Sequence, residues 1–243
     1  MIDVHCHFDL CDKPVEEIQR LERMKILTIG MTNLPSHFEL GFRFTKNMRF
    51  IRLALGLHPL MANHHKTELS RFQRLLDQTS YIGEVGLDFS KEGFATKEVQ
   101  IRSFEFVLQK VRGRKKIISV HSRKAEKEVL RLVRKYEIPN VVFHWYSGSL
   151  EVLRQLISCG YYVSVNPAML RSTNGRRIID NVPLYSVLTE TDAPFTSNTD
   201  DTVQPGNVSS VILYLADLHS LKREVVEAQI KSNFNKLVAK IRN

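Results

Sequence analysis

The chain has 243 residues, of which 43% are hydrophobic and 25% charged, which is typical of a globular protein with a substantial core. It contains no apolar run close to the roughly 20 residues of a membrane span and lacks the charged, then apolar beginning of a signal peptide. Its three cysteines, Cys6, Cys11 and Cys159, form no C-x-x-C pair, so we expect free thiols in a reducing cytoplasm and no disulfide framework.

Short apolar runs alternate with helical segments along the whole chain. The runs are rich in Val, Ile and Tyr, are bounded by Gly, Asn or Pro, and are short enough for buried parallel strands. In chain order they cover residues 2–5, 25–30, 50–56, 81–84, 117–121, 141–144, 161–165 and 186–190. Apolar residues three or four apart predict helices over 101–111, 129–136 and 208–218, and helical spacing is weakest over 171–182.

Eight strand–helix units of about thirty residues each have the size and rhythm of a (β/α)8 TIM barrel. No linker, low-complexity tract or change of composition marks a boundary, so we expect residues 1–243 to form a single α/β domain. An open doubly wound sheet is the alternative, but no glycine-rich phosphate-binding fingerprint follows any of the strands.

Metal-binding types of side chain recur where the predicted strands end. His5 and His7 lie on the same face of an extended chain, although a single His-x-His is a weak signal. The active site of a TIM barrel lies at the C-terminal rim of its strands, where closure would bring such residues together. The residues at or just after strand ends are His5, His7, His58, Glu84, His121, His144 and Asp192.

Glu84 is the most informative of these residues. It ends an apolar strand, and an unpaired buried carboxylate costs several kcal/mol, so a positive group must face it. Two metal ions meet this need, because a carboxylate can bridge two cations while histidines complete their shells. The remaining histidines, His37, His64, His65 and His219, fall in helical or loop segments and are expected at the surface.

The net charge of +9 is unevenly spread. The segment 110–135 contains eleven basic residues against Glu126 and Glu128, which gives it a net charge of +9 by itself. A clustered basic surface favours a polyanionic partner, nucleic acid first, but a solvated helix face would explain the cluster equally well.

Six short segments carry a family resemblance: "DVHCHFD", "GLHP", "GEVGLDF", "SVHSRKA", "FHWYSGS" and "ETDAP". Their order and spacing resemble those of TatD-type metal-dependent deoxyribonucleases, from Asp3 through Pro194. The resemblance implies a (β/α)8 barrel, a dinuclear metal centre and hydrolysis of DNA phosphodiester bonds. Members of the family are commonly 3′→5′ exonucleases on single strands. It also implies two divalent ions, for which mixed nitrogen and oxygen ligands suit Zn²⁺ or Mn²⁺, and Mg²⁺ through its abundance.

The resemblance also implies roles for individual residues. One metal would be held by His5, His7 and Asp192, and the other by His121 and His144, with Glu84 bridging the two. Asp192 would accept the proton of the attacking water. His58 would face the substrate phosphate or a further metal, Arg123 would clamp a phosphate, and Asp88 would orient a ligand or be a simple loop acid.

The chain departs from the family pattern at Lys124, where a small polar residue is usual, and at Trp145 and Tyr146, which add flat surfaces that could stack a base. A short, basic, divergent member also resembles the TatD-like component of Qat-type bacterial anti-phage defence operons, which implies protein partners in a defence complex.

Three other functions are compatible with the sequence. An amidohydrolase that cleaves C–N bonds also uses His-x-His, two later histidines and a final Asp, but often has a modified lysine where this chain has Glu84. A nucleotide phosphatase would use the same metals on a small substrate. A non-catalytic DNA-binding subunit would have no need of the full set of metal-type side chains.

Overall fold

The computed structural model describes residues 1–197 and 203–242. Its parallel strands form two hydrogen-bonded sheets, in the orders β1-β2-β3 and β4-β5-β6-β7-β8-β9. The strands are β1 (Ile2–Cys6), β2 (Leu27–Gly30), β3 (Ile51–Leu53), β4 (Leu55–Leu57), β5 (Tyr81–Gly86), β6 (Ile117–His121), β7 (Val141–Phe143), β8 (Tyr162–Val165) and β9 (Val187–Thr189).

The strand predicted over 50–56 is divided into β3 and β4 at Ala54. The division arises where the strand changes partner, since β3 pairs with β2 and β4 pairs with β5. The Thr32 hydroxyl occupies this junction: it donates to the Ala54 carbonyl oxygen (2.8 Å) and accepts from the Gly56 N–H (3.1 Å). A side chain thus replaces the ladder hydrogen bonds there, and β3 and β4 together fill one of the eight strand positions.

Backbone hydrogen bonds close the ring between its last and first strands. The Asp192 N–H donates to the His5 carbonyl oxygen (2.9 Å), and the His7 N–H donates to the Ala193 carbonyl oxygen (2.8 Å). With each strand parallel to its neighbour, the result is the predicted (β/α)8 barrel, and all strands end at the same rim.

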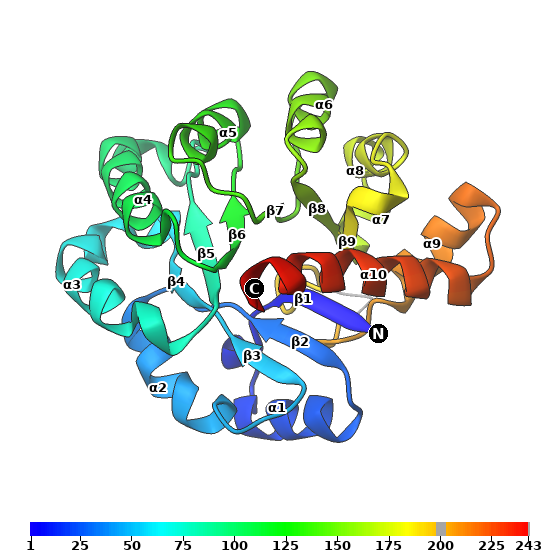
Figure 1. Ribbon diagram of the computed structural model, residues 1–243, viewed down its shortest axis with the longest axis horizontal. Helices are drawn as coiled ribbons and strands as arrows, with labels where there is room; N and C mark the ends of the chain where they lie inside the picture. The colour runs from blue at the N-terminus through cyan, green and yellow to red at the C-terminus, as the bar shows by residue number, and fades with distance from the viewer. Residues whose placement is uncertain (198–202, 243) are drawn as a thin grey trace.

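Helices surround the barrel (Figure 1). Most begin just beyond the rim and run back towards the N-terminal ends of the strands, as connections between parallel strands must. They are α1 (Pro14–Arg23), α2 (Pro35–Thr45), α3 (His65–Leu75), α4 (Lys97–Val111), α5 (Glu126–Lys135), α6 (Leu150–Ser158), α7 (Pro167–Arg171), α8 (Thr173–Ile179), α9 (Ser209–His219) and α10 (Arg223–Arg242).

The segment 171–182, where helical spacing is weakest, contains the end of α7 and all of α8. The two helices are separated at Ser172, and the Ser172 hydroxyl caps α8 by accepting from the Gly175 N–H. Among the described residues, no helix is both long and apolar enough to cross a membrane.

The helix α10 closes the N-terminal end of the barrel, where it lies across the strands in Figure 1. Its Phe234 and Leu237 are 3% and 1% exposed and pack in one cluster with Val4 and Ile117 from the strands. The sequence pattern did not predict this helix. Because it fills this end of the barrel, the opposite rim is the end left for a site.

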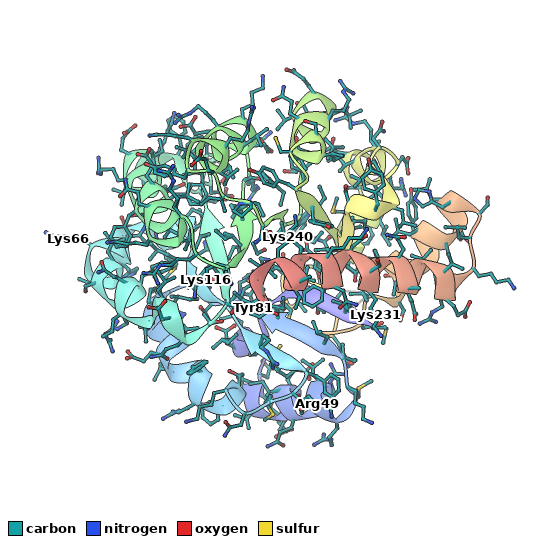
Figure 2. The ribbon with its side chains drawn as sticks, viewed as in Figure 1. Arg49, Lys66, Tyr81, Lys116, Lys231 and Lys240 are labelled. Atoms are coloured by element: carbon teal, nitrogen blue, oxygen red, sulfur yellow. The ribbon has the colours of Figure 1, made fainter. Side chains whose placement is uncertain are left out.

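The basic segment 110–135 lies largely away from the rim. Five of its basic residues precede β6 and so belong to the N-terminal end, where Figure 2 labels Lys116. The Lys116 ammonium donates to the carbonyl oxygens of Leu76 (2.8 Å) and Thr79 (2.6 Å). Other members form ion pairs: Arg112 with Glu137, Arg114 with Asp77, Arg131 with Glu128, and Lys135 with Glu105. The segment is therefore no continuous DNA-binding face.

Candidate metal centre

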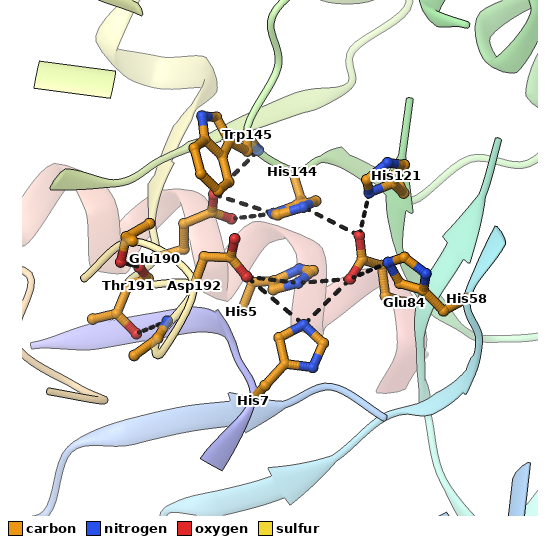
Figure 3. Close-up of polar contacts among 12 residues, drawn as sticks. His5, His7, His58, Glu84, His121, His144, Trp145, Glu190, Thr191 and Asp192 are labelled. Atoms are coloured by element: carbon orange, nitrogen blue, oxygen red, sulfur yellow. Dashed lines mark hydrogen bonds and ion pairs between the residues drawn. The ribbon is translucent and has the colours of Figure 1, made fainter. Parts of the chain in front are cut away.

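The seven strand-end residues meet at the rim around Glu84 (Figure 3). Glu84 is 2% exposed, and its two carboxylate oxygens face different imidazoles. The oxygen Oε2 lies 3.5 Å from His5 Nε2, 3.3 Å from His7 Nε2 and 3.3 Å from His58 Nε2. The oxygen Oε1 lies 2.6 Å from His121 Nδ1 and 3.2 Å from His144 Nε2. Asp192 Oδ1 approaches the same centre, 3.6 Å from His5 Nε2 and 3.7 Å from His7 Nε2.

Four buried atoms of these residues have no hydrogen-bond partner among the described residues: His7 Nδ1 and three that face the centre, His5 Nε2, His7 Nε2 and Asp192 Oδ1. Leaving buried polar atoms unpaired is costly, so their convergence needs a ligand. Two atoms bound at about 2.1 Å to one tetrahedral ion lie about 3.4 Å apart, which is close to the observed separations. The donor set therefore fits divalent metal.

Three triads bring their ligand atoms within 4.8 Å of one another: His5–His7–Glu84, His58–Glu84–His121 and His5–His144–Asp192. The first joins Glu84 to the two histidines that the resemblance assigned to one metal. The others differ from it, because His58 lies with His121 and Glu84, and because His144 lies with His5 and Asp192. The rings of His5 and His144 are stacked with centroids 3.7 Å apart. His58 is thus in position to ligate a metal.

Burial and charge set the protonation of these groups. Burial lowers the pKa of His5 to about 3, with His144 acting in the same direction, so the His5 imidazole is a neutral donor near pH 7. Burial opposes ionisation of Glu84, but the imidazoles around it, His58 first, hold its pKa well below the usual range. Burial raises the pKa of Asp192 to about 7 against the opposing effect of His144. Glu84 is therefore the firmly ionised carboxylate of the centre.

A second layer of polar groups orients the ligands. Ser119 Oγ lies 2.8 Å from His5 Nδ1, which leaves Nε2 of His5 directed at the centre. Asp88, predicted as an orienting group or a loop acid, is fully buried, and its Oδ2 lies 2.7 Å from His121 Nε2. Such contacts fix the ring orientation and raise the basicity of a ligand.

Glu190 is an orienting residue that the sequence analysis missed. It is fully buried, with Oε1 3.2 Å from His144 Nδ1 and 3.1 Å from the Trp145 backbone nitrogen. Ser164 and Asn166 also donate to its carboxylate. The signal was present in the "ETDAP" segment, where a second acid precedes Asp192 by two residues.

Two residues beside these carboxylates have left-handed backbone conformations that are unusual for side chains other than glycine: Trp145 (φ 39°) and Asp192 (φ 49°). Each is held by hydrogen bonds, the Trp145 N–H by Glu190 and the Asp192 N–H by the His5 carbonyl oxygen. Strain of this kind persists only where the surroundings enforce it, and it is typical of functional sites.

A cavity of about 470 Å³ opens above the centre. Arg123 lines it with its side chain 55% exposed and a guanidinium nitrogen 3.7 Å from Glu92 Oε2. Apolar side chains line it too: Leu60 is 41% exposed, Phe195 is 56% exposed, and Trp145 is partly buried. A charged floor with partly exposed apolar walls suits a ligand that has both anionic and flat apolar parts.

Two expectations about side chains near the centre were wrong. Tyr146 is 1% exposed and its hydroxyl donates to the Ser149 carbonyl oxygen (2.7 Å), so it has no surface on which a base could stack. His65 is 2% exposed rather than at the surface, because its Nε2 contacts the His58 carbonyl oxygen (3.0 Å) across the loop between β4 and α3.

Known proteins resemble the chain over nearly its whole length. The sequence profile described as TatD related DNase matches residues 2–239. The human protein named deoxyribonuclease TATDN3 is 24% identical over 263 residues, covering 100% of this chain and 96% of its own. The Escherichia coli K12 protein named uncharacterized metal-dependent hydrolase YjjV is 28% identical over 236 residues, covering 92% of this chain and 90% of its own.

Solved structures share the fold. The crystal structure of YjjV, a TatD homologue from Escherichia coli K12, has a TM-score of 0.87 at 25% identity and covers 98% of this chain and 97% of its own. An uncharacterized amidohydrolase from Saccharomyces cerevisiae has a TM-score of 0.81 at 13% identity, covering 97% of this chain and 99% of its own. The second likeness is one of fold alone.

Proposed function

The chain belongs to the TatD-related DNase family, and from this membership we propose that it is a metal-dependent deoxyribonuclease that hydrolyses phosphodiester bonds with two divalent ions. The observation that carries the proposal is the convergence around Glu84 of buried ligand atoms that have no hydrogen-bond partner among the described residues. The proposed metal ligands are His5, His7, His58, Glu84, His121, His144 and Asp192. Zn²⁺, Mn²⁺ and Mg²⁺ are the candidate ions.

The bound ions would supply Lewis acidity and a water of lowered pKa. The chain's own residues would hold the ligands together, accept the proton and contact the phosphate. Glu84 keeps the two groups of imidazoles together, and Asp192 Oδ1 lies buried at the centre, in position to take the proton of the attacking water. Arg123 reaches the same cavity from the end of β6, where its planar guanidinium can contact a phosphate.

The walls of the cavity favour single-stranded DNA. In a duplex the faces of the bases are stacked on one another, whereas a single strand can place them against Leu60, Trp145 or Phe195. Cleavage from a 3′ end is the form of the activity that the family resemblance favours, and we include it in the proposal. A role in anti-phage defence, with protein partners, stays a prediction from the sequence.

Arg123→Ala tests the nuclease proposal against an enzyme acting on neutral amides. A phosphodiester keeps a negative charge that needs a cationic partner, so the variant should keep its metals but lose about 2–4 kcal/mol of transition-state stabilisation on DNA. Arg131→Ala is the matched control, because Arg131 is also 55% exposed but lies on the outer helix α5. Metal content and cleavage of end-labelled single-stranded and double-stranded DNA are measured together.

Unchanged DNA cleavage by Arg123→Ala with both metals bound would remove Arg123 from the site. A wild-type protein that releases phosphate from a nucleotide but leaves an oligonucleotide intact would replace the nuclease with a phosphatase.

A further inference from the structure

Two arginines, Arg176 and Arg177, lie on α8, the helix that follows β8 and α7 in the chain (Figure 1). A short series of contacts joins Arg177 to the cavity wall. Ser147 lines the cavity, and its carbonyl oxygen accepts from Asn174 Nδ2 (3.0 Å). Asn174 Oδ1 in turn accepts from the guanidinium of Arg177 (2.7 Å). Arg177 is therefore two hydrogen bonds from the wall of the site.

These arginines differ from the basic residues of segment 110–135 in their partners. Arg176 and Arg177 are both exposed, and the Arg176 guanidinium donates to the Leu170 carbonyl oxygen (3.2 Å). Within the described part of the chain, neither of them forms an ion pair with a carboxylate, whereas Arg131 and Lys135 on α5 both do. Their charge is thus available to an external anion.

The neighbouring loops connect this pair with the apolar walls. Trp145 precedes Ser147 by two residues and lines the cavity, and its backbone is held by Glu190. On the other side, the Arg171 guanidinium donates to the Thr196 carbonyl oxygen, next to Phe195. A strand leaving the cavity past Trp145 would meet the side of the rim that carries Arg176 and Arg177.

We propose that Arg176 and Arg177 bind backbone phosphates of a single DNA strand outside the cavity, so that the strand runs from the metal centre past Trp145 and over α8. The inference rests on the proposed nuclease function. In this proposal α8 binds phosphates without regard to sequence, and α5 does not bind them. Phosphate contacts of this kind hold a strand in register without reading its sequence.

The test compares the double variant Arg176→Gln/Arg177→Gln with the control Arg131→Gln/Arg134→Gln. Each removes two positive charges from an exposed helix surface, but the control lies on α5. The substrates are a single-stranded oligonucleotide of about 20 nucleotides, longer than a typical binding site, and a dinucleoside monophosphate whose single phosphate occupies the metal centre. The values of kcat and KM are measured at several salt concentrations.

We expect the α8 variant to raise KM for the long oligonucleotide about 5-fold, as the removal of two exposed positive charges would. The dependence of log KM on log salt should weaken by about 1.4, because each phosphate of a single strand that is no longer neutralised reduces the slope by about 0.7. The α8 variant should keep the wild-type kcat and the wild-type efficiency on the dinucleotide. The α5 control should keep wild-type values on both substrates. An unchanged KM and salt dependence in the α8 variant, or an equal change in the control, would overturn the inference.

Binding is also measured without cleavage, by fluorescence anisotropy of the long oligonucleotide in a Glu84→Gln background. Weaker binding after the α8 substitutions supports the inference even if the wild type cuts no DNA, an outcome that would refute only the proposed nuclease. Affinity that does not change on substitution of Arg176 and Arg177 would refute the inference even if the wild type is a nuclease.

Discussion

The two ends of the barrel are made by the same strands but differ in how far their buried polar groups are paired within the chain. At the N-terminal end two polar side chains find partners within the chain: Lys116 donates to two carbonyl oxygens, and Asn233 Nδ2 donates to the carbonyl oxygens of Leu184 and Val187 (both 2.8 Å). One buried atom there, Asn140 Oδ1, has no hydrogen-bond partner among the described residues. Phe234 and Leu237 cover the apolar ends of the strands. At the rim, His5, His7 and Asp192 have buried atoms without a hydrogen-bond partner in the part of the chain that the structure describes.

This difference distinguishes the end of the barrel that folding completes from the end that a ligand would complete. A buried polar atom without a partner lowers stability, so the convergence of several such atoms on one point at the rim indicates that something other than folding requires them. The exposed side chains of Leu60 and Phe195 at the rim support the same interpretation. These large apolar groups could be buried but remain in contact with solvent around a charged centre.

The largest expected effect is at the rim, for Glu84→Gln. The substitution keeps the size of the side chain but removes the negative charge that faces the imidazoles, so metal binding and hydrolysis should fall together, with kcat lower by at least about 10³-fold. The fold should persist, since Glu84 is not part of the apolar core. Metal analysis, DNA cleavage and thermal unfolding measure the three properties.

Glu68→Gln is the control for this variant. Glu68 is also buried, but it lies on α3, where its carboxylate accepts from the Ser36 N–H (2.9 Å) and pairs with Arg71. Its substitution should leave metal content and kcat unchanged. Full activity of folded Glu84→Gln would end the metal-centre interpretation.

At the opposite end, Phe234→Ala should affect stability and leave the chemistry alone. Removing a buried phenyl ring typically costs about 3–5 kcal/mol, so the free energy of unfolding in urea should fall by this amount while kcat stays near the wild-type value. Phe195→Ala is the matched change at the rim: its ring is 56% exposed, so it should raise KM for DNA with a stability change below about 0.5 kcal/mol. Equal destabilisation by the two variants would remove the distinction between the ends.

The sequence was sufficient to predict the barrel and the meeting of the candidate ligands at its rim, for one shared reason. Each ligand follows a strand of recognisable apolar character, and parallel strands in a closed ring must end together. Predicting strand ends therefore predicted that His58, His121 and His144 would meet, although they are far apart in the chain. The exception within the strands was the division at Ala54, which depends on the hydroxyl of Thr32 from the segment after β2.

The sequence could not predict features that depend on contacts between distant segments. The apolar residues Val226, Ile230 and Phe234 have the spacing of a helix, but spacing does not say that α10 crosses the base of the barrel. The acidic partners of segment 110–135 include Asp77 and Glu137, which lie outside it, so its local charge overstated the charge available to DNA.

Glu190 gives the smallest expected effect, because it acts on the metal through His144. Its carboxylate accepts from His144 Nδ1, the Trp145 N–H, Ser164 Oγ and Asn166 Nδ2, and in Glu190→Gln one of these donors would meet an NH₂ group instead. We expect about 10- to 100-fold weaker metal binding, the range for the loss of an orienting partner, measured by Zn²⁺ titration against a chelator. Cleavage at saturating metal should largely recover, whereas Glu84→Gln should not recover. Metal affinity equal to that of the Glu68→Gln control would mean that Glu190 serves only to hold the fold at the rim.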